Sequence, residues 1–528
     1  MRRFLPLGLA LGLLLAISSC IAPQATADAI AARILVDGKT LEVHLPAGST
    51  VQQALDEAGV QLNSLDRVAP PPYALVQDGT EVSVTRVEER FEIEQIPLPF
   101  DRQTLPNETL PEGETRLLQP GQNGLQEVTY RILLEAGVEI SRAPVKSVTL
   151  SEPVPEIVMV GTQSATTPVV IEGRLLYMAS GNAWLMEGNS ANRMPILVSG
   201  DLDGRIFRVS PDGRWLLLSR VSDDEDVINE LWITPLDDSE PEPIYLGVDN
   251  VVHFADWVPE VPSRSIAFST VEPSPGAPGW QANNDLQIVN LTQTGRPMAP
   301  RIVVDSNAGG QYGWWGTEFL WGSDPAHLAY ARADGFGLVD LDSGRLEPAR
   351  QITPYQTLSD WAWVPGIAWS PDHQTLYFID HGPPAGLESP QASPIFNLAA
   401  KPRVGPSQLT LVERTGMFAF PRVSPLLPSD TAEVRFRIAF LEAVHPLESE
   451  NSGYRLAVID RDGSNHQVLF PPQNQEGLEP ARPGPVWSPS GSRIAIIYQG
   501  DLWIVDIATG AGQQLTADGQ VETLAWAP

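Results

Sequence analysis

The chain has 528 residues, of which 42% are hydrophobic and 19% are charged, and these proportions are typical of a folded protein rather than a disordered one. This length exceeds what one compact core usually holds, so two to four domains are expected. The 65 acidic and 34 basic side chains give a net charge of −31, which disfavours electrostatic binding to nucleic acid or to anionic lipid headgroups.

The start of the chain has the features of an export signal. Arg2 and Arg3 precede an apolar run from Phe4 to Ile17, which is shorter than the 18 or more apolar residues typical of a membrane-spanning helix. Small residues follow and end at Cys20, the only cysteine of the sequence, so no disulfide can form within the chain. The domains must therefore be stable through their cores alone.

The stretch Ile17-Ser18-Ser19-Cys20 resembles the lipobox of bacterial lipoproteins, with Ile where Leu is commoner. The resemblance implies that a signal peptide, residues 1–19, is removed and that Cys20 carries lipid at the start of a tether, residues 20–32. An ordinary signal peptide with an incidental cysteine is the alternative. No second long apolar segment follows, so we expect lipid to hold the protein outside the cytoplasm, on the inner or the outer membrane.

Residues 33–88 have the pattern of a small β-grasp domain. Apolar residues alternate on both sides of the turn Asp37-Gly38, which predicts a hairpin. Thr50 then caps a helical stretch that Gly59 ends, and LVQDGTEVSVTRV supplies further strands. The segment resembles the ubiquitin-like domain that precedes G5 domains in bacterial cell-wall proteins such as resuscitation-promoting factors.

Residues 89–163 resemble a G5 module over nearly their whole length. The matching positions are Gly121, Gly124, the strand EVTYRI, a strand from Glu139 to Val148 and the closing IVMVGT. The glycines are expected to supply turns and close backbone approach rather than chemistry. The resemblance implies an extended β structure that acts as a spacer or binds a glycan containing N-acetylglucosamine. We favour the spacer because no aromatic platform is evident here.

From residue 164 the sequence repeats. The clearest copy, PVWSPSGSRIAIIYQGDLWIVDIATG, reads as an opening strand that ends in Trp-Ser-Pro, a turn, and two further alternating strands. Uneven spacing of the copies is consistent with four-stranded propeller blades that carry loop insertions. The prolines that end the opening strands are Pro211, Pro259, Pro325, Pro371, Pro425, Pro489 and Pro528.

The last residues, VETLAWAP, form an opening strand with no blade behind it, whereas Gly173 to Gly200 is a blade whose opening strand is missing. Joined, the two complete a blade and remove an open sheet edge. The sequence thus predicts a mainly β protein whose residues 164–528 form a seven-bladed propeller closed by the C-terminal strand, with six or eight blades as alternatives. The repeats resemble the WD40-like TolB and Tricorn-type families, although Val209 replaces the motif Trp in one copy. The motif Trp and Pro residues are expected in the core and in turns.

Motifs for catalysis and metal binding are absent. The sequence contains no G-x-S-x-G or H-E-x-x-H pattern, and its seven histidines lie far apart with no ligand spacing. We therefore expect no catalytic residue, no metal site and no cofactor. Calcium is the alternative, because Ser199–Gly204 and Ser222–Glu230 space carboxylates suitably, although neither completes an EF-hand loop.

Aromatic residues gather in GGQYGWWGTEF, which holds Tyr312, Trp314 and Trp315, and Trp280 lies in another insertion. These side chains either stack on a ligand or pack over the channel mouth. We expect a non-enzymatic envelope binding or scaffold protein that recognises a protein, a peptide or a glycan such as peptidoglycan. A propeller-type polysaccharide hydrolase or lyase, with carboxylates at the channel, and a purely structural spacer are the alternatives.

Overall fold

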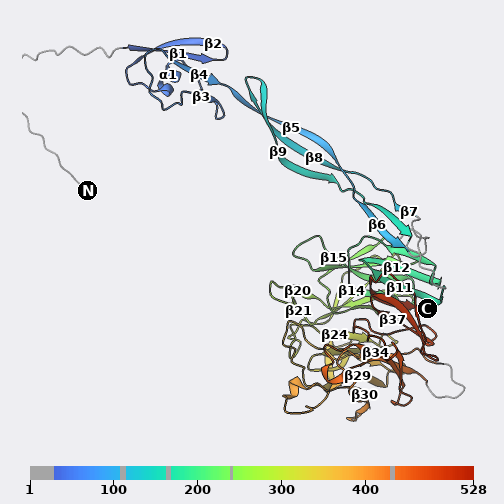
Figure 1. Ribbon diagram of the computed structural model, residues 1–528. Coiled ribbons are helices and arrows are strands. Elements are labelled where there is room, and N and C mark those ends of the chain that lie inside the picture. The colour runs from blue at the N-terminus through green and yellow to red at the C-terminus, as the bar shows by residue number, and fades with distance from the viewer. Residues whose placement is uncertain (1–28, 108–114, 162–167, 238–241, 428–434) are drawn as a thin grey trace, which may run out of the picture. The chain divides into compact units, whose positions relative to one another are not determined.

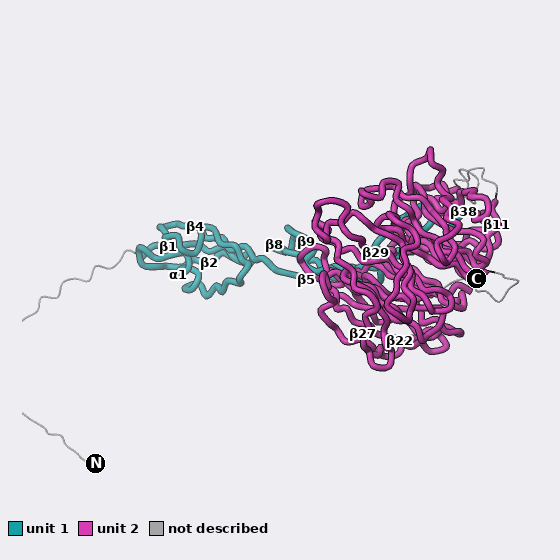
Figure 2. Tube along the Cα trace, turned by 90° about the horizontal axis from the view of Figure 1, so that it is seen from below, with its two compact units in different colours: residues 1–105, 116–158 teal, residues 106–115, 159–528 magenta. Residues whose placement is uncertain are grey.

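The computed structural model describes residues 29–107, 115–161, 168–237, 242–427 and 435–528, so Cys20 and its lipobox lie outside the described residues. The described chain is mainly β (Figure 1). It divides into two compact units, residues 1–105 with 116–158 and residues 106–115 with 159–528 (Figure 2). Among the described helices, none has the length and apolar character needed to cross a membrane.

The first sheet of the smaller unit has the strand order β2-β1-β4-β3. Strand β1 pairs with β2 in an antiparallel and with β4 in a parallel arrangement, and helix α1 begins after a capping box made by Thr50 and Gln53. Strand β1 starts before the expected boundary at Arg33, because Ala29–Ala32 pair with Val43–Pro46. The elements are β1 (Ala29–Val36), β2 (Lys39–Pro46), α1 (Val51–Glu57), β3 (Arg67–Ala69) and β4 (Thr80–Thr85).

Two three-stranded sheets follow, in the orders β5-β8-β9 and β6-β10-β7. Every residue of β9 is exposed. A Cβ atom at Gly124 would lie 2.4 Å from the carbonyl oxygen of Ser151, and one at Gly121 would lie 2.3 Å from the Phe100 ring, so both glycines permit close approach as predicted. The strands are β5 (Val87–Leu98), β6 (Arg102–Asn107), β7 (Thr115–Gln119), β8 (Gly124–Glu135), β9 (Val138–Ser151) and β10 (Glu156–Gly161).

The larger unit contains seven four-stranded antiparallel sheets within its described residues. The first has the order β13-β12-β11-β40, and the next two have the orders β14-β15-β16-β17 and β18-β19-β22-β23. Their strands are β11 (Val170–Ala179), β12 (Asn182–Asn189), β13 (Arg193–Leu197), β14 (Leu202–Val209), β15 (Trp215–Val221), β16 (Asn229–Pro235), β17 (Ile244–Asp249), β18 (Ala255–Trp257), β19 (Ser265–Phe268), β22 (Leu286–Asn290), β23 (Arg301–Val304) and β40 (Val521–Ala527). A small ribbon of β20 (Val271–Pro273) and β21 (Trp280–Ala282) lies in the third repeat.

The other four sheets keep the sequential order of their strands, β24 to β27, β28 to β31, β32 to β35 and β36 to β39. Their strands are β24 (Glu318–Trp321), β25 (Leu328–Arg332), β26 (Gly335–Asp340), β27 (Arg345–Gln351), β28 (Ile367–Trp369), β29 (Thr375–His381), β30 (Phe396–Pro402), β31 (Leu409–Val412), β32 (Arg422–Val423), β33 (Arg437–Ala443), β34 (Tyr454–Asp460), β35 (Gln467–Phe470), β36 (Val486–Trp487), β37 (Arg493–Tyr498), β38 (Asp501–Asp506) and β39 (Gly512–Gln514). Two short 3-10 helices, η1 (Pro390–Ala392) and η2 (Pro446–Glu448), lie in the connections.

The last strand of the chain pairs with the first sheet of the larger unit, as the sequence predicts. Strand β40 is antiparallel to β11, with Leu176 opposite Ala525 and Tyr177 opposite Leu524. Val521 and Leu524 are buried in this pairing. The first sheet is therefore built from residues at both ends of the larger unit.

The opening strands, defined here as β40, β14, β18, β24, β28, β32 and β36, lie next to one another in that order. Strand β14 adjoins β40 and β18, β28 adjoins β24 and β32, and β36 adjoins β32 and β40. Phe254, directly before β18, packs against Phe319 of β24 with ring centroids 5.3 Å apart. The hydrophobic cores lie between successive sheets.

Motif tryptophans tie neighbouring sheets together. The indole Nε1 of Trp257 donates to the carbonyl oxygen of Arg208 at 3.3 Å. In the same way, Trp369 donates to Leu320 at 3.3 Å and Trp487 donates to Arg422 at 3.0 Å. These three indoles are buried, so the prediction that motif tryptophans are core elements is confirmed for them.

Candidate functional site

Two adjoining cavities, of about 320 and 460 Å³, lie among the opening strands of the larger unit. The larger cavity is lined by residues from all seven opening strands, so it lies where these strands face one another. We call the two together the strand cavity. The residues that line both parts are Arg208, His253, Glu318, Phe420, Arg482 and Pro483.

One position of the repeat recurs in the lining of the larger part. It is the residue immediately before the motif tryptophan, and in a strand the side chains of adjacent residues point to opposite faces. Trp257 and Trp487 are buried, whereas the residues before them, Asp256 and Val486, line the cavity. Six of the seven sheets place this residue in the lining, namely Arg208, Asp256, Leu320, Arg422, Val486 and Ala525.

Arg208 and Arg422 bring positive charge into the cavity without a direct ion-pair partner. The Arg208 guanidinium donates to the carbonyl oxygen of Phe207 at 3.1 Å, and that of Arg422 donates to the carbonyls of Pro421 at 3.2 Å and Pro483 at 2.7 Å. Among the described residues, no carboxylate forms an ion pair with either arginine. Desolvation, with the neighbouring Arg208 and Arg482, lowers the pKa of Arg422 to about 10.

Two carboxylates share the cavity with these arginines. Glu318 forms an ion pair with Arg482, whose guanidinium also lies 5.9 Å from the centre of the Phe420 ring. Asp256 accepts a hydrogen bond from the backbone N–H of Trp257 at 2.8 Å. Desolvation raises the pKa of Asp256, and the nearby Arg208 opposes that shift. In the larger part of the cavity, three guanidinium groups thus face two carboxylates.

The smaller part of the cavity has an aromatic lining in which two predicted residues meet. The Trp280 and Trp315 ring centroids are 5.5 Å apart, and Trp280 Nε1 donates to the Trp315 carbonyl at 3.2 Å. Arg205 lies over Trp280, with 5.1 Å between its guanidinium carbon and the ring centroid. Trp361, Phe418 and Phe420 line the same part.

His253 lies beside these tryptophans, with its ring centroid 5.1 Å from that of Trp315 and 5.7 Å from that of Trp280. Its Nε2 atom is buried and has no hydrogen-bond partner among the described residues. Desolvation lowers the pKa of His253 to about 4, while the charge of Glu318 opposes this shift and the charges of Arg482 and Arg205 add to it. The imidazole is therefore neutral near pH 7.

The other two predicted aromatics lie outside the lining of the strand cavity. Trp314 meets Trp315 edge-on at a centroid distance of 6.0 Å, and its carbonyl accepts a hydrogen bond from Ala282. The Tyr312 carbonyl accepts from the Trp315 backbone N–H at 3.0 Å, which shapes the turn. Neither side chain is among those that line the strand cavity.

The two acidic stretches use carboxylates to hold strands. Asp201 pairs with Arg220 at 2.7 Å, and Asp203 accepts a hydrogen bond from Asn229 at 2.7 Å. In Ser222–Glu230, Glu230 accepts from Ser222 at 3.1 Å and from the Trp232 indole at 3.0 Å. These contacts give each named carboxylate a structural partner.

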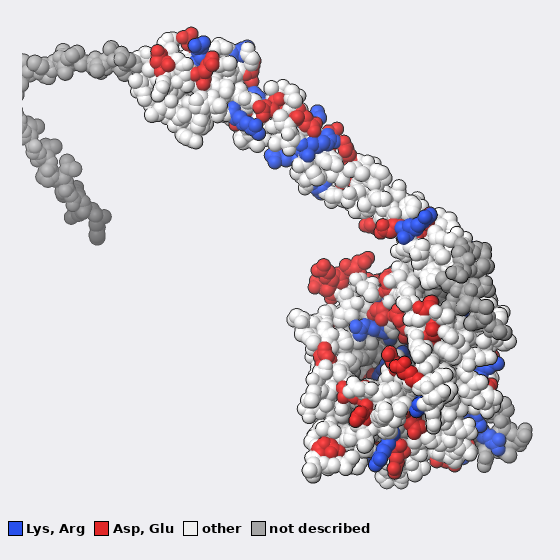
Figure 3. Space-filling model, in the orientation of Figure 1, with Lys and Arg blue, Asp and Glu red and all other residues white. Residues whose placement is uncertain are grey.

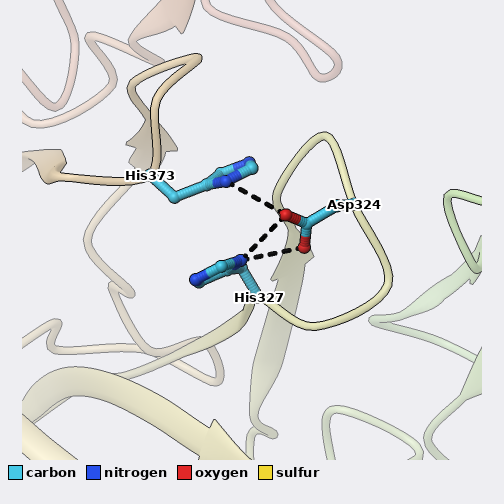
Figure 4. A group of neighbouring side chains, drawn as sticks. All are labelled: Asp324, His327 and His373. Carbon is cyan, nitrogen blue, oxygen red and sulfur yellow. Dashed lines mark hydrogen bonds and ion pairs between the residues drawn. The ribbon is translucent and has the colours of Figure 1, made fainter.

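The fold brings together two histidines that are distant in sequence, His327 and His373, around Asp324 (Figure 4). His327 Nδ1 lies 2.8 Å from one Asp324 oxygen, and His373 Nδ1 lies 3.3 Å from the other. On the opposite side of the rings, Arg403 donates to His327 Nε2 at 2.9 Å and the Ser323 backbone N–H donates to His373 Nε2 at 2.8 Å. On each ring Nε2 therefore faces a donor and Nδ1 faces the Asp324 carboxylate, which is the arrangement that a proton on Nδ1 satisfies.

The geometry of this histidine pair determines what it can do. The His327 and His373 rings are stacked, with centroids 4.4 Å apart and planes 17° apart. A metal ion prefers to lie near the plane of each imidazole that binds it. Two stacked rings direct their in-plane nitrogen lone pairs side by side and not toward one common point. In this arrangement the group is a hydrogen-bonded tie between the turns that follow β24 and β28.

Comparison with known proteins identifies two N-terminal modules. The G5 domain model matches residues 87–163, and the G5-linked ubiquitin-like domain model matches residues 33–72. Resuscitation-promoting factor RpfB of Mycolicibacterium smegmatis is 32% identical over 152 residues, which are 28% of this chain and 42% of that protein. The chain therefore spans less than half the length of this curated relative.

Solved structures resemble different parts of the chain. The G5 domain of an IgA1 protease is 30% identical, covers 15% of this chain and 94% of its own, and has a TM-score of 0.12. A prolyl endopeptidase chain is 13% identical, covers 68% of this chain and 50% of its own, and has a TM-score of 0.42.

Proposed function

We propose that the protein is a lipid-anchored binding protein of the bacterial cell envelope, in which a stalk presents a β-propeller. Cys20 carries the anchor, residues 33–88 and 89–163 form the stalk as a β-grasp and a G5 domain, and residues 164–528 form a seven-bladed propeller. The G5 and ubiquitin-like matches and the resemblance to a resuscitation-promoting factor support the envelope location. The seven four-stranded sheets and the pairing of β40 with β11 support the propeller.

The strand cavity is the observation that carries a binding function. All seven opening strands contribute to it, and it combines aromatic rings with charged groups on one inward-facing surface. Sites that bind small molecules or chain ends have this composition, because aromatic rings supply contact area and a few charges fix orientation. The G5 segment acts as a spacer in this proposal, and binding of glycans containing N-acetylglucosamine is the alternative role.

Two neighbouring tryptophans allow a matched test. In the full-length Cys20→Ser protein, Trp315→Ala removes a ring that lines the cavity, whereas Trp314→Ala removes one that packs behind it. We expect Trp315→Ala to weaken co-sedimentation with purified peptidoglycan about tenfold or more, and Trp314→Ala to change it less than about twofold. Equal effects of the two substitutions, or no binding by the parent protein, would reject the proposal.

The two cavity carboxylates favour one second function, a polysaccharide hydrolase or lyase. Asp256, whose pKa is raised by desolvation, has the property of a general acid, and Glu318 lines the same cavity. The test is the release of new sugar ends from cell-wall polysaccharide. This function would be established if the release is lost in Asp256→Asn and retained when the exposed turn residue Asp342 is changed to Asn. If the parent protein releases no sugar ends, the hydrolase or lyase function is rejected and only the binding function remains.

A further inference from the structure

Positive charge in the strand cavity contrasts with the acidity of the rest of the protein. The chain has a net charge of −31, and acidic side chains are spread over the face of the larger unit drawn in Figure 3. Inside the cavity, by contrast, Arg208, Arg422 and Arg482 meet two carboxylates. An anion that reaches this cavity therefore meets a favourable local field despite the overall repulsion.

The charge is unevenly compensated. Arg482 is paired with Glu318, but Arg208 and Arg422 have only carbonyl acceptors. Asp256 interacts electrostatically with both arginines, but its carboxylate makes no ion pair with either among the described residues. Guanidinium groups match carboxylate geometry with two parallel hydrogen bonds, so a bound carboxylate would relieve the mutual repulsion of the two arginines.

The aromatic part of the cavity indicates what carries the carboxylate. Its described lining contains Trp280, Trp315 and Trp361, and its uncharged polar side chains are those of His253 and Thr523 alone. A peptide main chain needs partners for each amide, whereas a sugar ring presents an apolar C–H face that suits an indole. The sugar hydroxyls can use the guanidinium and carboxylate groups of Arg205 and Glu318.

We propose that the strand cavity binds a sugar that carries a carboxylate, with Arg208 and Arg422 holding the carboxylate and the tryptophans contacting the ring. This inference rests on the proposed binding function and names its ligand class. The larger part of the cavity takes the anionic group, because Arg422 lines that part, and the smaller part takes the sugar ring.

Two sugars that differ mainly in one carboxylate provide the test. N-acetylmuramic acid is N-acetylglucosamine with an added lactyl group, and both can be titrated calorimetrically into the full-length Cys20→Ser protein. We expect the acid to bind at least about tenfold more tightly at low salt, and rising ionic strength to reduce the difference. Arg422→Gln and Arg208→Gln should each remove most of the preference, whereas Arg422→Lys should keep part of it.

Controls separate the possible failures. Arg345→Gln removes an arginine of β27 outside the cavity and should leave the preference unchanged, and an unchanged unfolding midpoint shows that each cavity variant is folded. Equal affinity for the two sugars, or no binding of either, would overturn the carboxylate-sugar inference, while sedimentation with peptidoglycan decides the binding function separately. Equal binding of N-acetylglucosamine 1-phosphate would reject carboxylate selectivity, and tighter binding of N-acetylated dialanine would reject the sugar.

Discussion

At the scale of single residues, His253 couples the aromatic part of the cavity to pH. Its pKa falls from the ordinary value of 6.5 to about 4 in the folded protein, so the folded state favours the neutral imidazole. The stabilisation is complete above pH 6.5, the pKa of the unfolded chain, and is lost as the pH falls from there toward 4. Protonation is costly because the ring is desolvated near Arg482 and Arg205.

The prediction concerns the pH dependence of unfolding. Lowering the pH from 7.5 to 5 should cost the parent about 2 kcal/mol of unfolding free energy through this histidine alone. His253→Gln should remove that contribution, so the difference between variant and parent should shrink as the pH falls. Urea unfolding of both proteins at both pH values measures this difference in unfolding free energy. A difference that stays constant with pH would contradict the lowered pKa of His253 as its cause.

Residue chemistry was only partly predictable from the sequence. The composition of GGQYGWWGTEF indicates an aromatic loop, yet only the fold distinguishes Trp315, which lines the cavity, from Trp314, which does not. Arg208 and Arg422 lie far apart in the chain and meet only because their opening strands face one cavity. The available signal was the repeat itself, since each arginine directly precedes a valine at the motif tryptophan position.

At the scale of elements, strand β40 is stabilised by burial as well as by its pairing with β11. Leu524 is 1% exposed, whereas Glu522 in the same strand is exposed. Leu524→Ala should lower the unfolding free energy by about 2 to 5 kcal/mol, and Glu522→Ala by less than about 0.5 kcal/mol. Chemical unfolding followed by tryptophan fluorescence compares the two, and equal midpoints would show that β40 contributes little.

The three-stranded sheet β5-β8-β9 depends on a glycine at its end. A Cβ at Gly124 would lie 2.4 Å from the Ser151 carbonyl oxygen and 2.6 Å from the Pro153 nitrogen, both backbone atoms. Gly124→Ala should therefore cost about 1 to 3 kcal/mol through displaced backbone. The exposed Gln95→Ala in β5 serves as control, and circular dichroism at rising temperature follows the loss; a variant as stable as the control would contradict the steric reason.

Local sequence patterns predicted where strands lie better than they predicted which strands pair. Alternation and turn residues predicted the β1–β2 hairpin and the three strands of the last repeat, because those signals are contained in short segments. The pairing of β40 with β11 was also predictable, since two incomplete repeats complement each other. The early start of β1 at Ala29 was missed because its alanines gain strand structure only from the partner residues of β2.

At the scale of the whole molecule, the proposed anchor is testable without knowledge of the ligand. Cys20→Ser should move the protein from the membrane fraction to the soluble fraction of its host, because no other residue would carry lipid. Fractionation followed by immunoblotting measures the shift. Ser19→Ala, which keeps the cysteine and a small neighbour, is the control, and retention of Cys20→Ser on membranes would remove the lipid anchor from the proposal.

The pairing of β40 with β11 also has a consequence for how the protein is made. The Trp526 indole donates to the Glu172 carbonyl across 354 residues of sequence. The chain is synthesised from its N-terminal end, so β11 is made long before β40. The two strands can pair only after nearly the entire segment between them has been synthesised. Contacts this distant in sequence form slowly, since a long loop must close first. A product of premature termination would keep the edge of β11 unpaired, which makes truncated copies ready substrates for aggregation or proteolysis.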